Sequence, residues 1–537
     1  MQRAFLFSAK KGEFFMDLFI KIAMLVVFFG VMIGVGVYCK KHATDVNGFV
    51  LGGRNVGPWL TAFAYGTSYF SAVIFVGYAG QFGWKYGVAA TWIGIANAFL
   101  GSLLAWVVLG RRTRVMTRHL DSATMPQFFG ERFNSKSLKV FASVIIFIFL
   151  IPYTASLYNG LSRLFEMAFP GIPYSACVIA MAILTGVYVI VGGYMATAIN
   201  DFIQGLIMLV GIVAVVIAVL NLNGGFIGSL DGLAKVEDAA VSKTPGVFAS
   251  FFGPDPIGLL GVMILTSLGT WGLPQMVQKF YAIKSEKSIS KGTVISTVFA
   301  TVVAGGCYFL GGFGRLFSKD ITYLPNGSPS FDSIVPAMLQ KLPTILIAIV
   351  IILVLSASMS TLSSLVLTSS STLTLDFILP LKKKEMKKGA QLLTMRALIV
   401  VFVAISAVIA ILQYNNPASI GFIAQLMGIS WGALAGAFLA PFLYALYWKK
   451  VTKAACFINF IFSSVFMALV VFCKEIFPVF LQSPINSGAF CMLFGMILVP
   501  IVSLVTKPPK KEKVDEIFAC YDEKVLVSVK DSIGQEQ

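Results

Sequence analysis

The stretch Ser356-Ala-Ser-Met-Ser-Thr-Leu-Ser-Ser364 lies in the middle of a long apolar run of this chain. A helix that crosses a lipid bilayer should avoid hydroxyl groups, because lipid offers them no hydrogen-bond partner. Here the hydroxyls recur at the i, i+4, i+7 spacing that places side chains on one helical face. The side chains on this face are Ser356, Ser360, Thr361, Ser363 and Ser364.

A face of hydroxyls and neighbouring carbonyls is an oxygen surface, which suits a hard monovalent cation. Five hydroxyls on one face within nine residues favour a cation site over isolated polar substitutions. The alternative is that small residues allow close helix packing, while serine and threonine bond back to the preceding helical turn. Both interpretations place this segment, and the helix that carries it, inside a bundle.

The composition of the chain predicts an all-α polytopic membrane protein. The 537 residues are 57% hydrophobic and 12% charged, whereas soluble domains average about 25% charged residues. Runs long enough to cross a bilayer as helices begin at thirteen places. They are near Leu18, Pro58, Val88, Leu138, Tyr174, Ala198, Ile257, Gly292, Ile345, Ala390, Ser419, Ala454 and Gly488.

The net charge of +17 follows the loops rather than one patch, so we expect no nucleic-acid partner. Basic residues gather after every second span, which is the positive-inside pattern of a membrane protein. This pattern predicts an external amino terminus, a cytoplasmic carboxyl terminus and contact with membrane lipid. Residues that contribute to it include Lys40, Lys41, Arg111, Arg112, Arg114, Lys279, Lys284, Lys287, Lys449 and Lys450.

Three parts of the chain are expected. Residues 1–15 are an N-terminal extension with basic residues on the expected external side, and Met16 is the expected native start. A signal peptide is the alternative for this segment, but no small-residue cleavage site follows it. Residues 16–505 are the transmembrane domain, and residues 506–537 are a cytoplasmic tail.

Two spans contain residues that interrupt a helix. The second has Gly66-Thr-Ser-Tyr-Phe-Ser71 near its middle, where glycine among hydroxyls favours unwinding or, alternatively, close packing. The seventh contains Thr266-Ser-Leu-Gly-Thr-Trp-Gly-Leu-Pro-Gln275, and its glycines and proline cannot sustain a regular helix. Because these spans are five apart, we predict a five-plus-five inverted repeat with a site where the broken helices meet.

Asp201 is the acidic residue placed furthest inside an expected span, the sixth. Acidic residues within membrane spans are rare and commonly functional. An acid near a helix N-terminus is also favoured by the helix dipole. Both interpretations of Asp201 remain open on its position alone.

Several motifs of this chain resemble those of the sodium:solute symporter family, which includes the sodium/proline and sodium/pantothenate symporters. The similarity spans about residues 16–505 and implies a LeuT-type fold with about 13 transmembrane helices. The motifs are Gly52-Gly-Arg54, Ser68-Tyr-Phe-Ser-Ala72, Gly192-Gly-Tyr-Met-Ala196 with Asp201 and Gln204, Gly272-Leu-Pro274 and Ser358-Met-Ser-Thr-Leu-Ser363.

The resemblance also implies where sodium, the coupling ion, would bind. The principal sodium site would use five residues: Thr67, Phe70, Ala357, Ser360 and Thr361. Some relatives hold a second sodium ion, and the matching positions here are Asp201, Ser360, Ser363 and Ser364. We therefore predict two sodium ions for each solute.

The solute is expected to bind between the two broken helices, at Ser71, Phe75, Gln81, Thr266, Thr270 and Trp271. Thr266 and Thr270 replace the tryptophan and tyrosine typical of the proline symporters, and Tyr69 replaces their aspartate. The sequence from Lys85 to Gly87 is closer to the pantothenate type. The expected solute is therefore an amino acid such as proline or a carboxylate such as pantothenate.

Sodium-coupled import of a small solute across the plasma membrane by alternating access is the function that these patterns favour. An enzyme is not expected, because no Cys/His or His/Asp constellation lies in the spans. The alternatives are a sodium-independent facilitator, for which the hydroxyl face would serve packing only, and a transporter-like sensor. A sensor would need a signalling module, for which residues 506–537 are too few.

Overall fold

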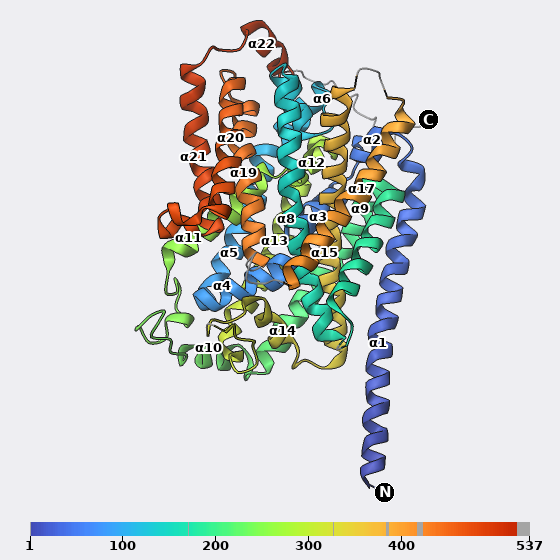
Figure 1. The fold of residues 1–537 in the computed structure, drawn as a ribbon, viewed down its shortest axis with the longest axis vertical. Coiled ribbons are helices and arrows are strands. Elements are labelled where there is room, and N and C mark those ends of the chain that lie inside the picture. The colour runs from blue at the N-terminus through green and yellow to red at the C-terminus, as the bar shows by residue number, and fades with distance from the viewer. Residues whose placement is uncertain (1, 170, 326, 383–385, 416–422, 523–537) are drawn as a thin grey trace, which may run out of the picture.

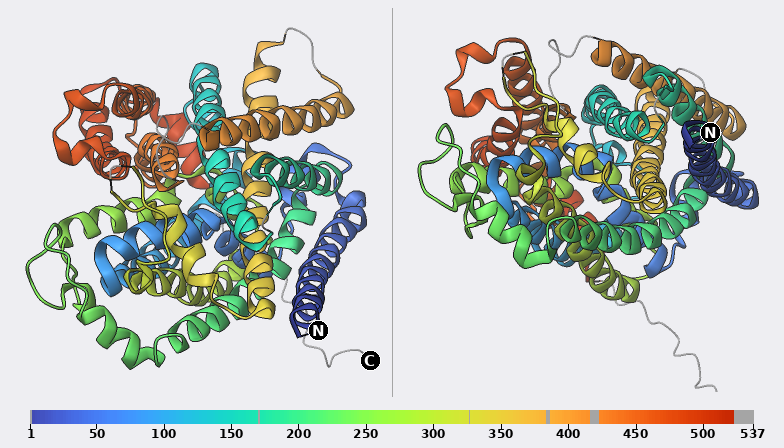
Figure 2. Two further views of the ribbon diagram at one scale, coloured as in Figure 1. Left: turned by 60° about the horizontal axis from the view of Figure 1, so that its bottom comes forward. Right: turned by 90° about the horizontal axis from the view of Figure 1, so that it is seen from below.

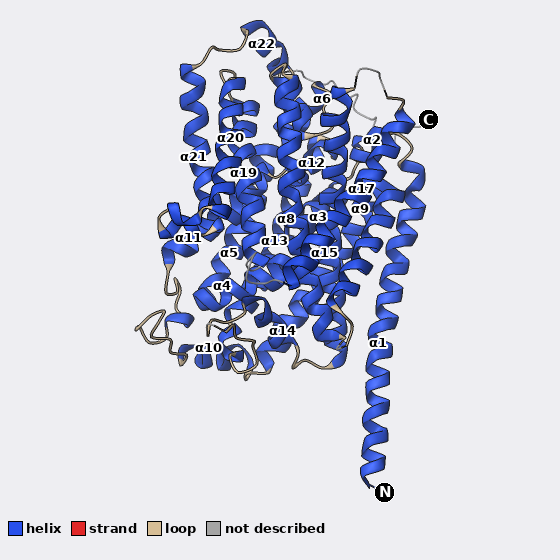
Figure 3. Cartoon of the chain, viewed as in Figure 1, coloured by secondary structure: helices blue, strands red, loops and turns tan. Residues whose placement is uncertain are grey.

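The computed structural model describes residues 2–169, 171–325, 327–382, 386–415 and 423–522, with the side chains of 2–15 and His42 outside the description. Within these residues every regular element is a helix (Figure 3). The start of the span predicted near Ser419 and residues 523–537 of the predicted tail lie outside the described residues.

The helices, labelled as in Figure 1, follow one another along the chain with short connections. Their bounds are α1 (Gln2–Cys39), α2 (Val46–Leu51), α3 (Pro58–Tyr69), α4 (Ala79–Tyr86), α5 (Thr91–Ala96), α6 (Arg111–His119), α7 (Met125–Arg132), α8 (Lys136–Ala168), α9 (Tyr174–Asn221), α10 (Gly225–Ala234), α11 (Pro256–Gly272), α12 (Pro274–Ala282), α13 (Glu286–Gly312), α14 (Ile334–Leu339), α15 (Thr344–Thr372), α16 (Leu379–Leu381), α17 (Lys388–Asn415), α19 (Ile423–Tyr447), α20 (Lys453–Phe472), α21 (Pro484–Val505) and α22 (Lys511–Ala519). π-Helical segments are η3 (Val73–Tyr78), η5 (Asn97–Leu104), η6 (Trp106–Gly110) and η10 (Leu373–Ile378), and short 3₁₀ turns include η2 (Gly52–Arg54) and η9 (Phe331–Ser333).

Ten helical stretches among the described residues are long and apolar enough to cross a membrane, and eleven if α11 and α12 form one span. This supports a multi-pass membrane protein, whereas the predicted count of thirteen stays a prediction. One reason is α9, which covers two predicted spans in 48 residues. Gly193 interrupts it with φ 58° and ψ −151°, a conformation that favours glycine.

α15 lies inside the bundle and carries the hydroxyl face. It packs against α3, α8, α9 and α17, and Figure 2 shows it enclosed by other helices in both views. Its side chains from Val350 to Thr372 are all buried. The polar face therefore meets protein and not lipid, as membrane helices require.

The first predicted interruption, in the second span, is confirmed. α3 ends at Tyr69, Phe70 is extended (φ −103°, ψ 95°), and helix resumes at Val73. The Ser71 side chain accepts a 3.3 Å hydrogen bond from the Val73 amide at the start of the new segment. Backbone carbonyls near the end of α3 are thereby left without helical partners.

The second interruption, in the seventh span, is also confirmed. α11 and α12 meet at a 45° bend at Leu273, immediately before Pro274. Gly272 is required there because a Cβ atom would lie 2.7 Å from the backbone nitrogen of Leu439 on α19. The proline removes a helical donor, and the glycine lets α19 approach the break.

The two broken spans are joined at one end of the bundle. Val56, just before α3, donates a 3.2 Å hydrogen bond to the carbonyl of Ala282 at the end of α12. Its own carbonyl accepts a 3.0 Å bond from the Lys284 amide. α6 and α22 lie at this end, whereas α10 and α14 lie at the opposite end, beyond which α1 extends (Figure 1).

Candidate functional site

Two hydroxyls of α15 meet the carbonyl at the end of α3. Ser360 Oγ donates a 2.8 Å hydrogen bond to the Thr67 carbonyl, and Thr361 Oγ1 lies 3.2 Å from the same oxygen. Thr361 Oγ1 is also 3.1 Å from the Ala357 carbonyl and 3.5 Å from the Ser68 carbonyl. Five oxygens from two helices therefore converge where α3 stops.

The hydroxyls of this group donate hydrogen bonds here and also have lone pairs that suit a cation. A hydroxyl has one donor hydrogen and two acceptor lone pairs, so rotation about its C–O bond turns a lone pair toward an ion. The Thr67 side chain bonds back to Phe63, which leaves the Thr67 carbonyl for α15. Phe70, the remaining predicted member, is buried directly at the break.

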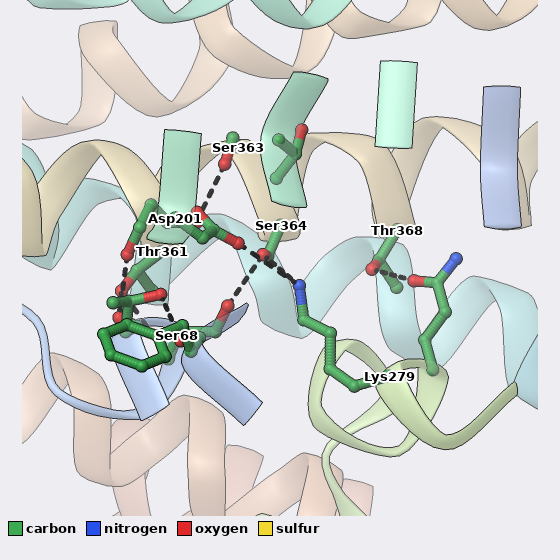
Figure 4. Close-up of polar contacts among 12 residues, drawn as sticks. Ser68, Asp201, Lys279, Thr361, Ser363, Ser364 and Thr368 are labelled. Carbon is green, nitrogen blue, oxygen red and sulfur yellow. Dashed lines mark hydrogen bonds and ion pairs between the residues drawn. The ribbon is translucent and has the colours of Figure 1, made fainter. Parts of the chain in front are cut away.

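Asp201 on α9 is fully buried and lies beside a positively charged side chain, that of Lys279. The Lys279 ammonium group is 3.8 Å from Asp201 Oδ2 and donates a 2.9 Å hydrogen bond to Ser364 Oγ (Figure 4). The positive-inside pattern predicts Lys279 in a cytoplasmic loop. That prediction is wrong, because the Lys279 residue is 2% exposed and lies on α12 inside the bundle.

The four residues predicted for a second sodium ion do not point at one place. The Lys279 ammonium group contacts both Ser364 and Asp201 and so connects them. The Ser364 hydroxyl is also 2.8 Å from the Ser68 hydroxyl. Ser363 Oγ donates instead to the Ser360 carbonyl at 2.8 Å. The Ser360 hydroxyl is directed at Thr67. Asp201 and Ser364 therefore form one position, which Lys279 reaches, and we name it the second cation position.

Of the predicted solute residues, Ser71 and Phe75 lie beside the oxygen group. They line a cavity of about 10 Å³, together with Phe70 and Ala357 of the predicted sodium site. The rest of the lining is apolar and comes from α9, α13 and α15. The cavity is only as large as one water molecule needs, so the site is closed around this point.

The other predicted solute residues lie away from this cavity. On α11 the hydroxyl of Thr266 bonds back to Val262 at 2.8 Å, whereas the hydroxyl of Thr270 lies 2.9 Å from the Gly101 carbonyl of η5. The Trp271 indole donates to the Leu100 carbonyl at 3.0 Å. The Thr270 and Trp271 contacts join α11 to η5. Gln81 lies on α4, is partly exposed, and its side-chain oxygen has no hydrogen-bond partner among the described residues.

Two aromatic residues near the α3 break have no counterpart in the predicted solute site. Trp431 on α19 lies between Tyr69 and Tyr153 of α8, with 6.0 Å between ring centroids on each side. The Trp431 Nε1 and Tyr153 hydroxyl atoms are buried without a hydrogen-bond partner among the described residues. Such atoms are costly unless a ligand or water satisfies them. The sequence signal was weak, a tyrosine after Pro152 and a tryptophan in a glycine-rich span.

An all-helical membrane bundle with two interrupted spans, and buried oxygens gathered at one interruption, defines a secondary transporter. The profile of the sodium:solute symporter family matches residues 49–462. The chain belongs to this family, and sodium is its coupling ion.

Relatives agree with this assignment, and a solved structure has the same fold. The sodium/proline symporters of Staphylococcus aureus strains JH9 and NCTC 8325 are 31% identical to this chain over 500 residues, which cover 91% of it and 92% of the relative. The structure of a Na⁺-coupled sialic acid symporter in a substrate-bound outward-open state superimposes with a TM-score of 0.69. It is 18% identical and covers 92% of this chain and 99% of its own, so it shows the shared fold. The chain is a sodium-coupled solute importer.

Proposed function

We propose that this protein imports a small amino acid or organic acid across the plasma membrane by alternating access, with sodium bound at the α3 break. The Thr67, Phe70 and Ala357 carbonyls and the Ser360 and Thr361 hydroxyls are its ligands. The observation that carries the proposal is that Ser360 and Thr361 both direct their hydroxyls at the Thr67 carbonyl. Packing alone does not require two hydroxyls on one carbonyl of another helix.

The solute binds next to this ion, on the side of the break that faces α8 and α19. Ser71 provides a hydroxyl, and Tyr153 and Trp431 provide a hydroxyl and an indole N–H that lack partners. Aromatic side chains with a few polar groups are the usual lining of a small-molecule site. Because Ser71 and Phe70 are adjacent, the solute and the ion share the unwound segment, which couples their binding.

The chemistry of the solute follows from the donors. A hydroxyl and an indole N–H without partners favour an acceptor such as a carboxylate. Proline and pantothenate both carry one, and relatives at 31% identity are named sodium/proline symporters. We place proline first among the candidates and pantothenate second.

The joined ends of α3 and α12 close the pathway on one side. We propose that this side, where α6 lies, faces the cytoplasm, which puts the amino terminus outside. The thirteen spans and the inverted repeat of five plus five helices belong to this proposal, with α9 counted as two spans. Opening toward the cytoplasm would then require the hydrogen bonds of Val56 to Ala282 and Lys284 to break.

The test is uptake of radiolabelled L-proline and of pantothenate by proteoliposomes that contain the purified protein. Import should need an inward sodium gradient and should stop when potassium replaces sodium. Equal uptake with and without sodium would show a facilitator instead. If neither solute is imported, a thermal-shift screen of amino and organic acids in sodium buffer identifies the solute class. Absence of any solute response would favour the sensor alternative.

A further inference from the structure

The side chain of Lys279 meets three different groups at the second cation position. An ammonium group has three N–H donors and no acceptor. One donor is hydrogen-bonded to Ser364, at 2.9 Å. Asp201 supplies the opposite charge at 3.8 Å, and the ring of Tyr194 lies 5.3 Å from the nitrogen, within cation–π range. The position therefore already holds a cation with its charge compensated.

Asp201 depends on this cation. Its two carboxylate oxygens are buried and accept no hydrogen bond from any described residue. A buried carboxylate is costly unless it is paired. The Lys279 ammonium supplies that pairing within the described part of the chain.

A sodium ion and the ammonium group exclude one another there. A sodium ion bound to Asp201 and Ser364 would lie within about 5 Å of the Lys279 nitrogen, because that nitrogen is itself 2.9 Å from Ser364 Oγ. At the effective dielectric of a protein interior, repulsion of two unit charges at about 5 Å lowers binding by roughly two orders of magnitude. The residues around Asp201 therefore do not suit a sodium ion while Lys279 is in place.

We propose that the Lys279 ammonium group is a built-in substitute for a second sodium ion, so that the protein binds and transports one sodium ion per cycle. This inference rests on the proposed principal sodium site and replaces the two-ion stoichiometry that the sequence favours. One ion supports roughly 500-fold accumulation of a neutral solute at 100 mV and a tenfold sodium gradient, whereas two support on the order of 10⁵-fold.

The ammonium group is connected to the principal site through side chains. Ser364 bonds both Lys279 and the Ser68 hydroxyl, and Ser68 follows Thr67 at the end of α3. One residue before Lys279, Gln278 accepts a 2.8 Å hydrogen bond from Thr368, one turn beyond Ser364 (Figure 4). α12 is thus held along α15 by two adjacent residues. A cation covalently attached to α12 holds the two broken spans and α15 together in the absence of a second ion.

The experiment is equilibrium binding of ²²Na⁺ to the purified full-length protein, which needs no knowledge of the solute. The wild-type protein should bind one sodium ion, with a Hill coefficient of one. Lys279→Gln leaves Asp201 without its cation and should bind two ions. The double variant Lys279→Gln/Asp201→Asn, which removes both charges, should return to one ion, and Lys279→Arg, which keeps the charge, should also bind one.

Each outcome separates this inference from the proposed function. Two ions bound by the wild-type protein would overturn the inference and leave sodium coupling intact. A monodisperse Lys279→Gln protein that still binds one ion would overturn it as well. If Lys279→Gln does not fold, Lys279→Met, which also removes the charge and keeps Asp201, takes its place, and one ion bound by that variant would overturn the inference. No saturable binding by the wild-type protein would instead refute the principal sodium site.

Discussion

The hydroxyl of Ser360 on α15 donates a 2.8 Å hydrogen bond to the carbonyl of Thr67, 293 residues earlier, where α3 ends. An uninterrupted α3 would use that carbonyl within its own helix. The interruption at Phe70 and the hydroxyl face of α15 are therefore the two halves of the proposed sodium site. Loss of either half should weaken sodium binding before it lowers the stability of the fold.

Removing both hydroxyls tests this relationship. Ser360→Ala with Thr361→Ala should raise the sodium concentration for half-maximal uptake roughly a hundredfold or more, because each lost polar contact is worth about 1–3 kcal/mol. The measurement is sodium-dependent proline uptake at equal protein abundance. Ser358→Ala is the matched control, because this buried hydroxyl on α15 has no hydrogen-bond partner among the described residues. Unchanged sodium dependence in the double variant would make the hydroxyls packing groups.

The proposed solute site predicts that a change at Tyr153 weakens solute uptake and leaves sodium binding unchanged. Tyr153→Phe removes one hydroxyl and should raise the solute concentration for half-maximal uptake about tenfold, the cost of one hydrogen bond. ²²Na⁺ binding should stay unchanged. Tyr158→Phe on the same helix is the control, because five residues along α8 turn its buried hydroxyl to another face. Equal effects of both substitutions would place the solute elsewhere.

The bend between α11 and α12 predicts a stability effect. Gly272→Ala places a methyl group against the backbone of α19, 2.7 Å from a nitrogen that cannot move independently. Overpacking of this kind costs about 1–3 kcal/mol, so the melting temperature should fall. Gly305→Ala on α13 meets no atom within 4 Å and should be neutral. Equal melting temperatures for the two variants would show that α19 adjusts easily.

Asp332 lies on η9, outside the membrane spans, and its buried carboxyl predicts that the stability of the protein depends on pH. Burial raises the pKa of its carboxyl from 3.8 to about 6, partly offset by the hydrogen bond from the Ile423 amide. The folded protein therefore holds this proton more strongly than the unfolded chain does. The free energy of unfolding should fall by up to about 3 kcal/mol as the pH rises from about 4 to 6, and it should then level off.

Thermal unfolding between pH 4 and pH 8 measures this step. Asp332→Asn should remove it and should make the protein more stable than wild type above pH 6, where the wild-type carboxyl is ionised. If the Asp332→Asn variant loses the same amount of stability between pH 4 and pH 6, another titrating group causes the loss. The variant should match wild type near pH 4.

The residues that determine local backbone structure were readable from the sequence. Gly66, Ser71, Gly272 and Pro274 predicted both helix interruptions, because unwinding depends on each residue's own conformational preferences and missing donor. The hydroxyl face of α15 was readable too, because helical periodicity follows from sequence spacing alone. Family resemblance added Thr67 and Phe70 as predicted sodium ligands, and these two residues lie at the end of α3 and at the break.

Contacts between helices were decided only by the tertiary structure. Lys279 looked like one more basic residue after a span, yet the rotation of α12 against α9 and α15 turns it toward Asp201 and Ser364. Tyr153 and Trp431 likewise meet across α8 and α19. The sequence determines which side chains share a face of their own helix, whereas the packing of that helix decides which charge or ring they meet. The proposed count of one sodium ion depends on that packing, because it brings Lys279 to Asp201 and Ser364.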